Sequence, residues 1–421
     1  MSNWKYYLLV LFTLPLPFSG NVDWAWPLFC AAVFFMLFYE LKTSVYPLVL
    51  TKASPVWLLL LVAQLWVIIQ SLLLDNRHDI QHSLLQGLGL VAFFVLTLLL
   101  LTTRERIKRA IWVVILAASF QAIYGALMVL SGLEWSFFTE KSSYRGTATG
   151  TFINRNHLAG YLEMSLALGI GFLLSQSARY RGSWRQRLRQ TIDTILSPKV
   201  IMRLLLAVMV IALVLTRSRM GNTAFFASLM ITGALALLLM KNRSRATTVL
   251  LTSLLVIDVA IVGTFFGVEK VAERLQNTSV EKESRDEVAR DTYQMWQQNP
   301  ALGIGAGSYQ YTYPAYRSAD VTVRGLYDHA HNDYLQFLAE FGLPGFIALM
   351  LAAVWCGWLG LVAMRKRHSN LMKGLGFAST MGLLAIAIHS SVDFNLQIPA
   401  NAFMFVFLMA MACIARYTPL R

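Results

Sequence analysis

Two histidines stand close together in residues 327–345, YDHAHNDYLQFLAEFGLPG, just before a long apolar run. One of them could serve as a general base, because the unperturbed pKa of an imidazole lies near neutrality. The alternative is a metal site, but His329 and His331 are only two positions apart and no cysteine lies nearby. Such a pair is a weak ligand set. We therefore predict a catalytic histidine and no bound metal.

Two arginines lie in the turn of residues 216–222, TRSRMGN, between two apolar runs. A charged side chain near hydrocarbon costs several kcal/mol unless it is paired or hydrated, so such residues are functional candidates. Arg217 and Arg219 suit a phosphate group, because a guanidinium offers parallel donors and does not deprotonate. The alternative is that both side chains only extend to the membrane interface.

Residues 283–300, ESRDEVARDTYQMWQQNP, are expected to form an amphipathic helix on the membrane surface, because apolar side chains recur in it near helical spacing. Arg285 and Arg290 lie on this helix. Most of its charges are those of a solvated face with local ion pairs, for example between Arg285 and Asp286. Arg285 itself remains open to a second role.

A glycine-rich run, GIGAGS at residues 303–308, follows this predicted helix. Glycine-rich loops that cradle phosphates connect a strand to a helix, and the flanking sequence predicts no such strand. We interpret the run as a flexible turn at the membrane edge.

The composition identifies the environment in which these residues work. Hydrophobic residues make up 57% of the 421 residues and charged residues only 14%, whereas soluble proteins average about 25% charged residues. The net charge of +14 could suggest nucleic acid, but the basic residues concentrate in short loops between apolar runs, where they set membrane orientation. The three cysteines all lie inside apolar runs and predict neither a disulfide framework nor a zinc site.

The apolar runs predict an all-α polytopic membrane protein with about twelve transmembrane helices, in a single domain of residues 1–421. The expected spans are 6–18, 24–39, 55–74, 83–102, 110–131, 158–175, 200–215, 223–240, 247–268, 344–364, 371–391 and 402–415, of which the first is short.

The basic loops give the expected orientation. Alternating the helices places the loops at 42–52, 104–109, 179–199, 241–245 and 365–367 on one face. We predict that this face is cytoplasmic, with both termini there. The opposite face then receives residues 133–156, 216–222 and one long periplasmic loop of residues 269–333, expected to contain helices. This arrangement would gather His157, Arg217, Arg219, Arg285, Arg290 and His331 at one membrane surface.

Four stretches of the chain resemble the O-antigen ligase family, a group that also contains O-antigen polymerases. They are GTFINRNHLAGYL (150–162), TRSRMG (216–221), SRDEVARDTYQMWQQNPALGIGAGSY (284–309) and HAHNDYLQFLAEFGLPG (329–345). The last fits the ligase pattern of His, then Asn, Ser or Gln, nine residues, Gly, two residues, and Gly, Thr or Tyr. In this chain the pattern falls on His331, Asn332, Gly342 and Gly345.

The resemblance implies a GT-C-like glycosyltransferase that needs no metal, cofactor or nucleotide sugar. It would move a glycan from undecaprenyl diphosphate to an acceptor, at an active site that faces the periplasm in the bacterial inner membrane. The family's histidine falls on His331, and the arginine of its Ser-Arg-Gly motif falls on Arg219, although Met220 replaces the usual glycine. A second arginine falls on Arg285, with Arg290 as the alternative register.

These residue types suit the implied reaction. Breaking the bond between sugar and diphosphate builds negative charge that fixed guanidinium groups can stabilise, while His331 accepts the proton of the attacking hydroxyl. Further contacts to the diphosphate or the glycan are expected from Arg217, Arg290, His329, Asn332, Arg155 and His157. The expected partners are the carrier-linked donor, a lipid A–core acceptor and membrane lipid, with no nucleic acid, and the protein is expected to be a monomer.

Other functions compete with a ligase. O-antigen and exopolysaccharide polymerases, and protein O-oligosaccharyltransferases, use the same donor chemistry. Polymerases often show an arginine followed ten residues later by glycine, a spacing absent at the arginines predicted to be periplasmic, and oligosaccharyltransferases tend to carry larger periplasmic portions. A transporter or flippase could also have twelve helices, but its charges would follow the bilayer midplane. The sequence favours the ligase.

Overall fold

The fold was established from a computed structural model. It describes residues 3–43, 45–137, 139–176, 198–241, 284–321 and 327–419, with five single positions between 248 and 256. Within these ranges the chain is mostly helical, and its strands are limited to the short antiparallel pair β1 (Trp135–Ser136) and β2 (Thr139–Glu140).

In chain order, the described residues form the following α-helices. They are α1 (Asn3–Thr13), α2 (Ala25–Thr43), α3 (Leu48–Lys52), α4 (Ser54–Leu73), α5 (Arg77–Leu100), α6 (Arg104–Ser131), α7 (Arg155–Ser175), α9 (Pro198–Leu215), α10 (Arg219–Leu239), α13 (Arg285–Gln298), α14 (Tyr309–Thr312), α15 (Asp333–Lys366), α16 (Asn370–His389) and α17 (Pro399–Tyr417). Three short 3₁₀ turns join them: η1 (Phe18–Gly20), η3 (Tyr313–Ala315) and η4 (Asn395–Gln397).

Nine helices in the described part of the chain are long and apolar enough to cross a membrane. They are α2, α4, α5, α6, α7, α10, α15, α16 and α17. The prediction of an all-α, multi-pass membrane protein is therefore confirmed. The predicted spans 6–18 and 200–215 correspond to α1 and α9, which are not among the nine. Because the span at 247–268 and parts of the loop 269–333 lie outside the described residues, twelve crossings and the extent of that loop stay predictions.

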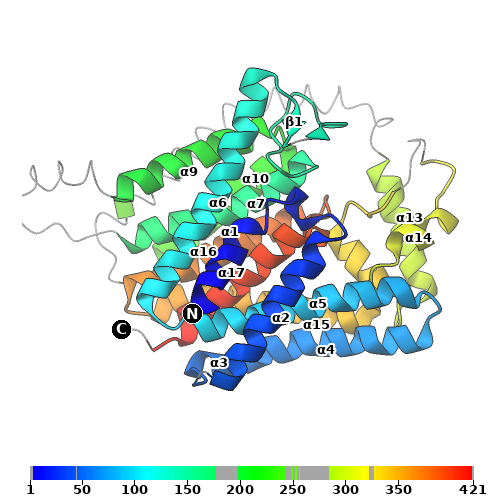
Figure 1. Cartoon of the computed structure of the whole chain (residues 1–421), viewed down its shortest axis with the longest axis horizontal. Helices are drawn as coiled ribbons and strands as arrows, with labels where there is room; N and C mark the ends of the chain where they lie inside the picture. Colours follow the sequence, from blue (N-terminus) through cyan, green and yellow to red (C-terminus); the bar gives the residue numbers. More distant parts are fainter. Residues whose placement is uncertain are drawn as a thin grey trace, which may run out of the picture.

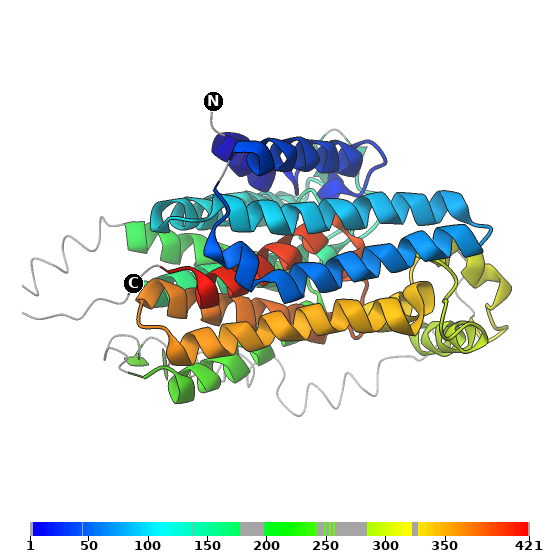
Figure 2. The same ribbon diagram turned by 90° about the horizontal axis from the view of Figure 1, so that it is seen from below.

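The long helices lie side by side (Figure 2), and α4, α5 and α15 follow the long axis of the molecule while α2, α6 and α17 cross it obliquely (Figure 1). Both termini lie at one end of this bundle, and α13 and α14 lie at the other end, beyond the first residues of α15 (Figure 2). The separation agrees with the predicted alternation, in which the termini and the polar segment belong to opposite faces. The cytoplasmic side of the termini remains a prediction.

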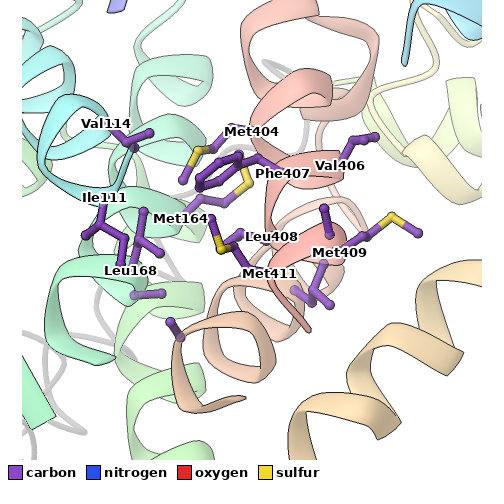
Figure 3. Packing of buried hydrophobic residues seen from close by; sticks show 14 of the residues in the cluster. Ile111, Val114, Met164, Leu168, Met404, Val406, Phe407, Leu408, Met409 and Met411 are labelled. Carbon is purple, nitrogen blue, oxygen red and sulfur yellow. The ribbon is translucent and has the colours of Figure 1, made fainter. Parts of the chain in front are cut away.

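The core forms around α7, α16 and α17, which are the most buried of the nine helices. Side chains of α6, α7 and α17 meet there, among them Val114, Met164 and Phe407 (Figure 3). Glycine brings α7 and α16 into backbone contact, because a Cβ on Gly171 would lie 2.3 Å from the carbonyl oxygen of Gly374. Small residues at helix contacts are the usual means of close packing within a membrane.

Helix α15 is broken near its start. Gly342 has φ 61° and ψ −179°, a conformation essentially restricted to glycine, and Pro344 has no backbone N–H to donate. Two carbonyl groups released by this break accept hydrogen bonds from the glycine-rich run, and these bonds join Ile304 N to Ala339 O (2.9 Å) and Gly305 N to Glu340 O (3.1 Å). The run is thus a turn, as predicted, and its backbone is tied to α15.

Helix α4 completes the same junction with two long side chains. Trp66 Nε1 donates to Phe341 O at 2.6 Å, and Gln70 Nε2 donates to Glu340 O at 2.8 Å and to Leu302 O at 2.6 Å. Backbone groups that a helix break leaves without helical partners are therefore satisfied by neighbouring elements, as buried polar groups require. The junction fixes the nine-residue segment that separates Gly342 from Asn332.

Substituting Gly342 by Ala is expected to destabilise the protein by about 3 kcal/mol or more. The new Cβ would lie 2.0 Å from Ala301 O, and the backbone would hold a conformation that alanine avoids. Thermal unfolding of the purified protein in detergent measures the effect. Gly357→Ala is the matched control, since it lies in the same helix with no neighbouring atom within 4 Å of the added methyl. Equal melting temperatures for both variants would contradict the proposed role of the break.

Candidate active site

The first residues of α15 are joined to the turn that follows α16. Asp333 N donates to Ser390 O (2.9 Å) and to Asp393 O (3.1 Å). The buried Asp333 carboxylate accepts from Ser390 Oγ (2.6 Å) and from Leu396 N (3.1 Å). This network fixes residues 390–394, which we call the catalytic turn, against the start of α15.

Asn332 caps α15 and adds a further link to the catalytic turn. Its side-chain oxygen accepts from Leu335 N at 3.1 Å, and its Nδ2 donates to Ser391 O at 2.9 Å. A residue that caps a helix in this way stabilises the first turn. Both polar atoms of this side chain already bind protein, so the structure gives Asn332 an architectural role, and its contact with substrate stays a prediction.

His331 lies in the left-handed region of backbone conformation, with φ 51°. Its half-buried ring meets the ring of Phe394 edge-on at 4.8 Å between centroids and that of Tyr327 at 6.1 Å. Tyr144 and Arg217 have similarly positive φ values of 56° and 53°. Strained backbone of this kind costs about 1–3 kcal/mol per residue and concentrates at functional sites.

His329 is held differently from His331. It stacks on Phe394 at 4.3 Å between ring centroids, and its Nδ1 lies 3.0–3.3 Å from the amide group of Gln336. Burial is the main cause that lowers the pKa of His329 to about 4. His329 is therefore neutral at pH 7, and Gln336 holds its ring in place.

A third histidine approaches the same phenylalanine from α7. His157 meets Phe394 edge-on at 4.6 Å, and its Nε2 lies 3.8 Å from Asp393 Oδ1. His389, at the end of α16, places Nε2 4.0 Å from the other oxygen of Asp393. Burial raises the pKa of Asp393, but interactions with His157 and His389 outweigh burial, so the pKa of this carboxyl lies below its ordinary value.

Arg285, the first residue of α13, reaches the same turn. Its Nη1 donates to Val392 O at 3.0 Å, and its charge helps to lower the pKa of Asp393. Val392 of the catalytic turn thus binds Arg285, and the ring of Phe394, two positions later, contacts His331. The sequence analysis had expected Arg285 and His331 at one membrane surface but had not identified this turn as their common contact.

Arg290 takes a different direction on α13. Its guanidinium binds Ser318 Oγ (3.0 Å) and Asp320 Oδ2 (3.1 Å), and its Nε lies 3.7 Å from Asp291. These contacts direct Arg290 to the segment after η3. Of the two arginine registers, the geometry brings Arg285 to the catalytic turn.

Arg217 and Arg219 occupy the turn between α9 and α10. Ser218 caps α10 by accepting from Gly221 N at 3.2 Å, and both arginine side chains are exposed, with no hydrogen bond or ion pair to any residue in the described ranges. The turn lies beside His389, because a Cβ on Gly221 would be 3.2 Å from His389 Cε1. A turn that packs against the histidine cluster thus carries two exposed guanidinium groups, which have no hydrogen bond or ion pair within the described residues.

The segment that precedes α7 adds Arg155 and Tyr144. The Arg155 guanidinium lies over the Tyr144 ring at 5.7 Å. Burial and the charge of Asp393 raise the pKa of Tyr144, whereas Arg155 and Arg285 act to lower it. The phenol therefore lies within the electrostatic reach of both arginines and of the catalytic turn.

The comparison with known families agrees with this geometry. Residues 204–350 match the family model described as O-antigen ligase. Residues 204–350 are therefore similar to the O-antigen ligase domain. The matched residues include Arg219, Arg285 and His331, and the resemblance to this family is thereby confirmed. No curated protein matches the chain. The domain identifies a function of the O-antigen ligase or polymerase type, in a multi-pass membrane protein.

The sequence analysis missed several residues that lie at the candidate site but outside the matched residues 204–350. Asp393, Phe394, His389 and Glu163 lie outside the matched residues and were assigned no role. A signal was present, since HSSVDFNLQ at residues 389–397 is polar between two apolar spans and faces the same side as His331. The spacing of His389 and Asp393 by four positions could have marked them as neighbours.

The cluster was also compared with the requirements of a metal site. Among the described residues, no group of three or more His, Cys, Asp or Glu side chains has an arrangement that could hold a metal ion. His329 binds Gln336, His157 faces Asp393, and His389 faces Glu163 and Asp393 with different ring nitrogens. Metal independence of the reaction remains a prediction, which chelation tests directly.

Proposed function

We propose that the protein is an O-antigen ligase, which transfers a completed glycan from undecaprenyl diphosphate to lipid A–core at the periplasmic face of the bacterial inner membrane. The observation that carries the proposal is that Arg285 and His331, which both lie within the matched residues 204–350, contact the same catalytic turn. In this proposal Arg285 supplies a cation for the diphosphate and His331 supplies a base for the acceptor, and their contacts with one turn support the pairing.

The proposed reaction is a single displacement at the anomeric carbon. An acceptor hydroxyl oxygen attacks that carbon, its proton passes to His331, and the bond between carbon and diphosphate oxygen breaks. The electron pair of the broken bond stays on the diphosphate. Arg285 and Arg219 stabilise the negative charge that develops there, because guanidinium groups fixed before the reaction need no reorganisation during it. The proton on His331 then returns to solvent.

Several other residues have proposed roles in substrate binding. Arg217 and Arg219 are exposed and lie on one turn, which suits contact with a diphosphate at the membrane surface. Arg155 supports the same charge from the side of Tyr144. His157 and His329 contact Phe394, so they shape the site around His331. Arg290 is proposed only as a glycan contact, since its guanidinium already binds Asp320.

The leading alternative is an O-antigen polymerase, which would use a second carrier-linked glycan as acceptor. The family match fits either activity. The missing spacing of arginine and glycine in the predicted periplasmic segments favours the ligase. Protein oligosaccharyl transfer and exopolysaccharide polymerisation require the same donor and are further outcomes of the test.

Deletion of the gene separates these functions. A ligase mutant is expected to lose long-chain lipopolysaccharide and to accumulate complete carrier-linked polymer. Gel analysis of lipopolysaccharide, together with analysis of the carrier-linked fraction, measures both. Accumulation of single repeat units would indicate a polymerase, and unchanged lipopolysaccharide with a lost glycoprotein would indicate an oligosaccharyltransferase. Complementation with the wild-type gene and with His331→Ala is the matched control.

A further inference from the structure

Four buried ionisable side chains form a chain that connects the middle of α7 to the catalytic turn. Glu163 Oε1 lies 3.0 Å from His389 Nδ1, His389 Nε2 lies 4.0 Å from Asp393, and Asp393 lies 3.8 Å from His157. Each of the four is at most 5% exposed. The reaction proposed above does not use any of these carboxylates.

The arrangement of these four side chains indicates that oppositely charged groups lie next to one another. A buried carboxylate is costly unless it is paired. His389 faces Glu163 with one ring nitrogen and Asp393 with the other, and an imidazole donates from both nitrogens only when it is protonated. A protonated His389 can therefore compensate the two carboxylates on either side of it.

Asp393 is also the centre of the contacts that hold the site. Its main-chain oxygen accepts from Asp333 N, which fixes the start of α15. The residue before it, Val392, accepts from Arg285. The residue after it, Phe394, contacts the ring of His331. A displacement of Asp393 would consequently move both groups to which the proposed reaction assigns chemistry.

We propose that Asp393 is a positioning residue, whose carboxylate is held between His157 and His389 and fixes the imidazole of His331 and the guanidinium of Arg285 through the catalytic turn. The inference rests on the proposed function of these two groups. It assigns a role to residues outside the matched family domain. Asp393 itself does not touch the substrate in this proposal.

Asp393→Asn tests the role of the carboxylate charge. The amide has nearly the same size and can still accept from Phe394 N, a hydrogen bond of 2.9 Å, but it no longer attracts His157 and His389. We expect kcat for transfer to fall about 10²-fold, the effect of a misplacement of about 1 Å. The KM for the carrier-linked donor should change little, because the lost interaction serves the transition state.

The pH profile of kcat provides a readout that a purely architectural role would not move. The ionisable groups that act on Asp393 from the surrounding elements are Tyr144, His157, Glu163, Arg285, His329, Asp333 and His389. The proposed reaction assigns the acid limb to His331, whose ring lies against Phe394, the residue after Asp393, and removing the negative charge of Asp393 disfavours protonation of a nearby imidazole. The acid limb of the profile should therefore move to lower pH in Asp393→Asn and stay in place in a variant that changes only packing.

Phe394→Leu is the variant that changes only packing. If Asp393→Asn does not fold, Phe394→Leu still tests the role of the catalytic turn. It removes the ring that His331 contacts, so kcat should fall without a shift of the acid limb. Asp75→Asn is the matched control, because Asp75 is exposed in the loop between α4 and α5. It should behave as wild type in kcat, in pH profile and in melting temperature.

The outcomes separate the inference from the proposed function. Wild-type kcat and an unmoved acid limb in folded Asp393→Asn would overturn the positioning role, while loss of transfer in His331→Ala would leave the proposed function intact. Wild-type kcat in Phe394→Leu would likewise overturn the role of the turn. Retained transfer in His331→Ala would instead contradict the proposed function itself.

Discussion

Replacing His331 by Ala is expected to abolish glycan transfer, whereas His329→Ala should retain a substantial fraction of it. A positioned general base contributes about 10²–10⁴-fold to a rate, and His331 is the histidine whose strained backbone and contact with Phe394 set its ring at the catalytic turn. His329 stacks on Phe394 and binds Gln336, so its loss removes packing but no proton acceptor. Transfer by purified enzyme, supplied with carrier-linked donor and acceptor, measures both variants.

The pH dependence of the same assay identifies the base. If His331 accepts the proton, activity falls as the pH drops through the pKa of His331, since a protonated imidazole no longer accepts a proton. His329 does not contribute to this limb above about pH 4, because burial holds the pKa of His329 to about 4. The loss of activity at acidic pH should therefore occur in His329→Ala at the same pH as in the wild type.

A metal mechanism makes a different prediction for the two histidines. It requires both of them, so their variants would lose activity equally, and chelated enzyme would recover on addition of a divalent ion. Under the base mechanism, chelators should have no effect. Equal losses with recovery by metal would replace His331 as a base with a metal site.

The helices could be predicted from sequence because their physical cause is local. Each apolar run of membrane length must form a helix to satisfy its own backbone hydrogen bonds in lipid, and runs such as 55–74 and 110–131 correspond to α4 and α6. The start of α15 at Asp333 was harder to predict from the sequence. Polar residues there suggested a loop, but Asn332 caps the helix and Gly342 breaks it nine residues after its start, just before the apolar run at 344–364.

The candidate site was only partly predictable because it depends on tertiary contacts. The identities of His331, Arg219 and Arg285 came from motif spacing, and the structure brings Arg285 and His331 to one turn. The turn itself escaped prediction because Asp393 and Phe394 belong to no motif and act through neighbours in space. A buried polar residue inside an apolar run, such as Glu163, gives no local signal of its role, because its partner His389 is far away in the sequence.

Replacing Arg285 or Arg219 by Ala is expected to lower the transfer rate by about 10²–10³-fold while leaving membrane insertion intact, which is the cost of removing one preorganised donor from a site of developing negative charge. Arg→Lys should also transfer poorly, because an ammonium cannot reproduce two parallel donors. Arg219 is exposed and Arg285 is anchored on Val392 O. Insertion and amount of each variant, measured in isolated membranes, separate a lost activity from a lost protein.

The comparison of Arg285 with Arg290 decides which arginine of α13 serves the diphosphate. Arg290 binds Ser318 and Asp320, so Arg290→Ala should leave most of the transfer activity, and Arg217→Ala should have an intermediate effect because Arg217 shares the turn of Arg219. Near-normal transfer in Arg285→Ala, combined with a large loss in Arg290→Ala, would move the role to Arg290. In that case α13 would have to turn its other side to the catalytic turn when substrate binds, and the bond between Arg285 and Val392 would break.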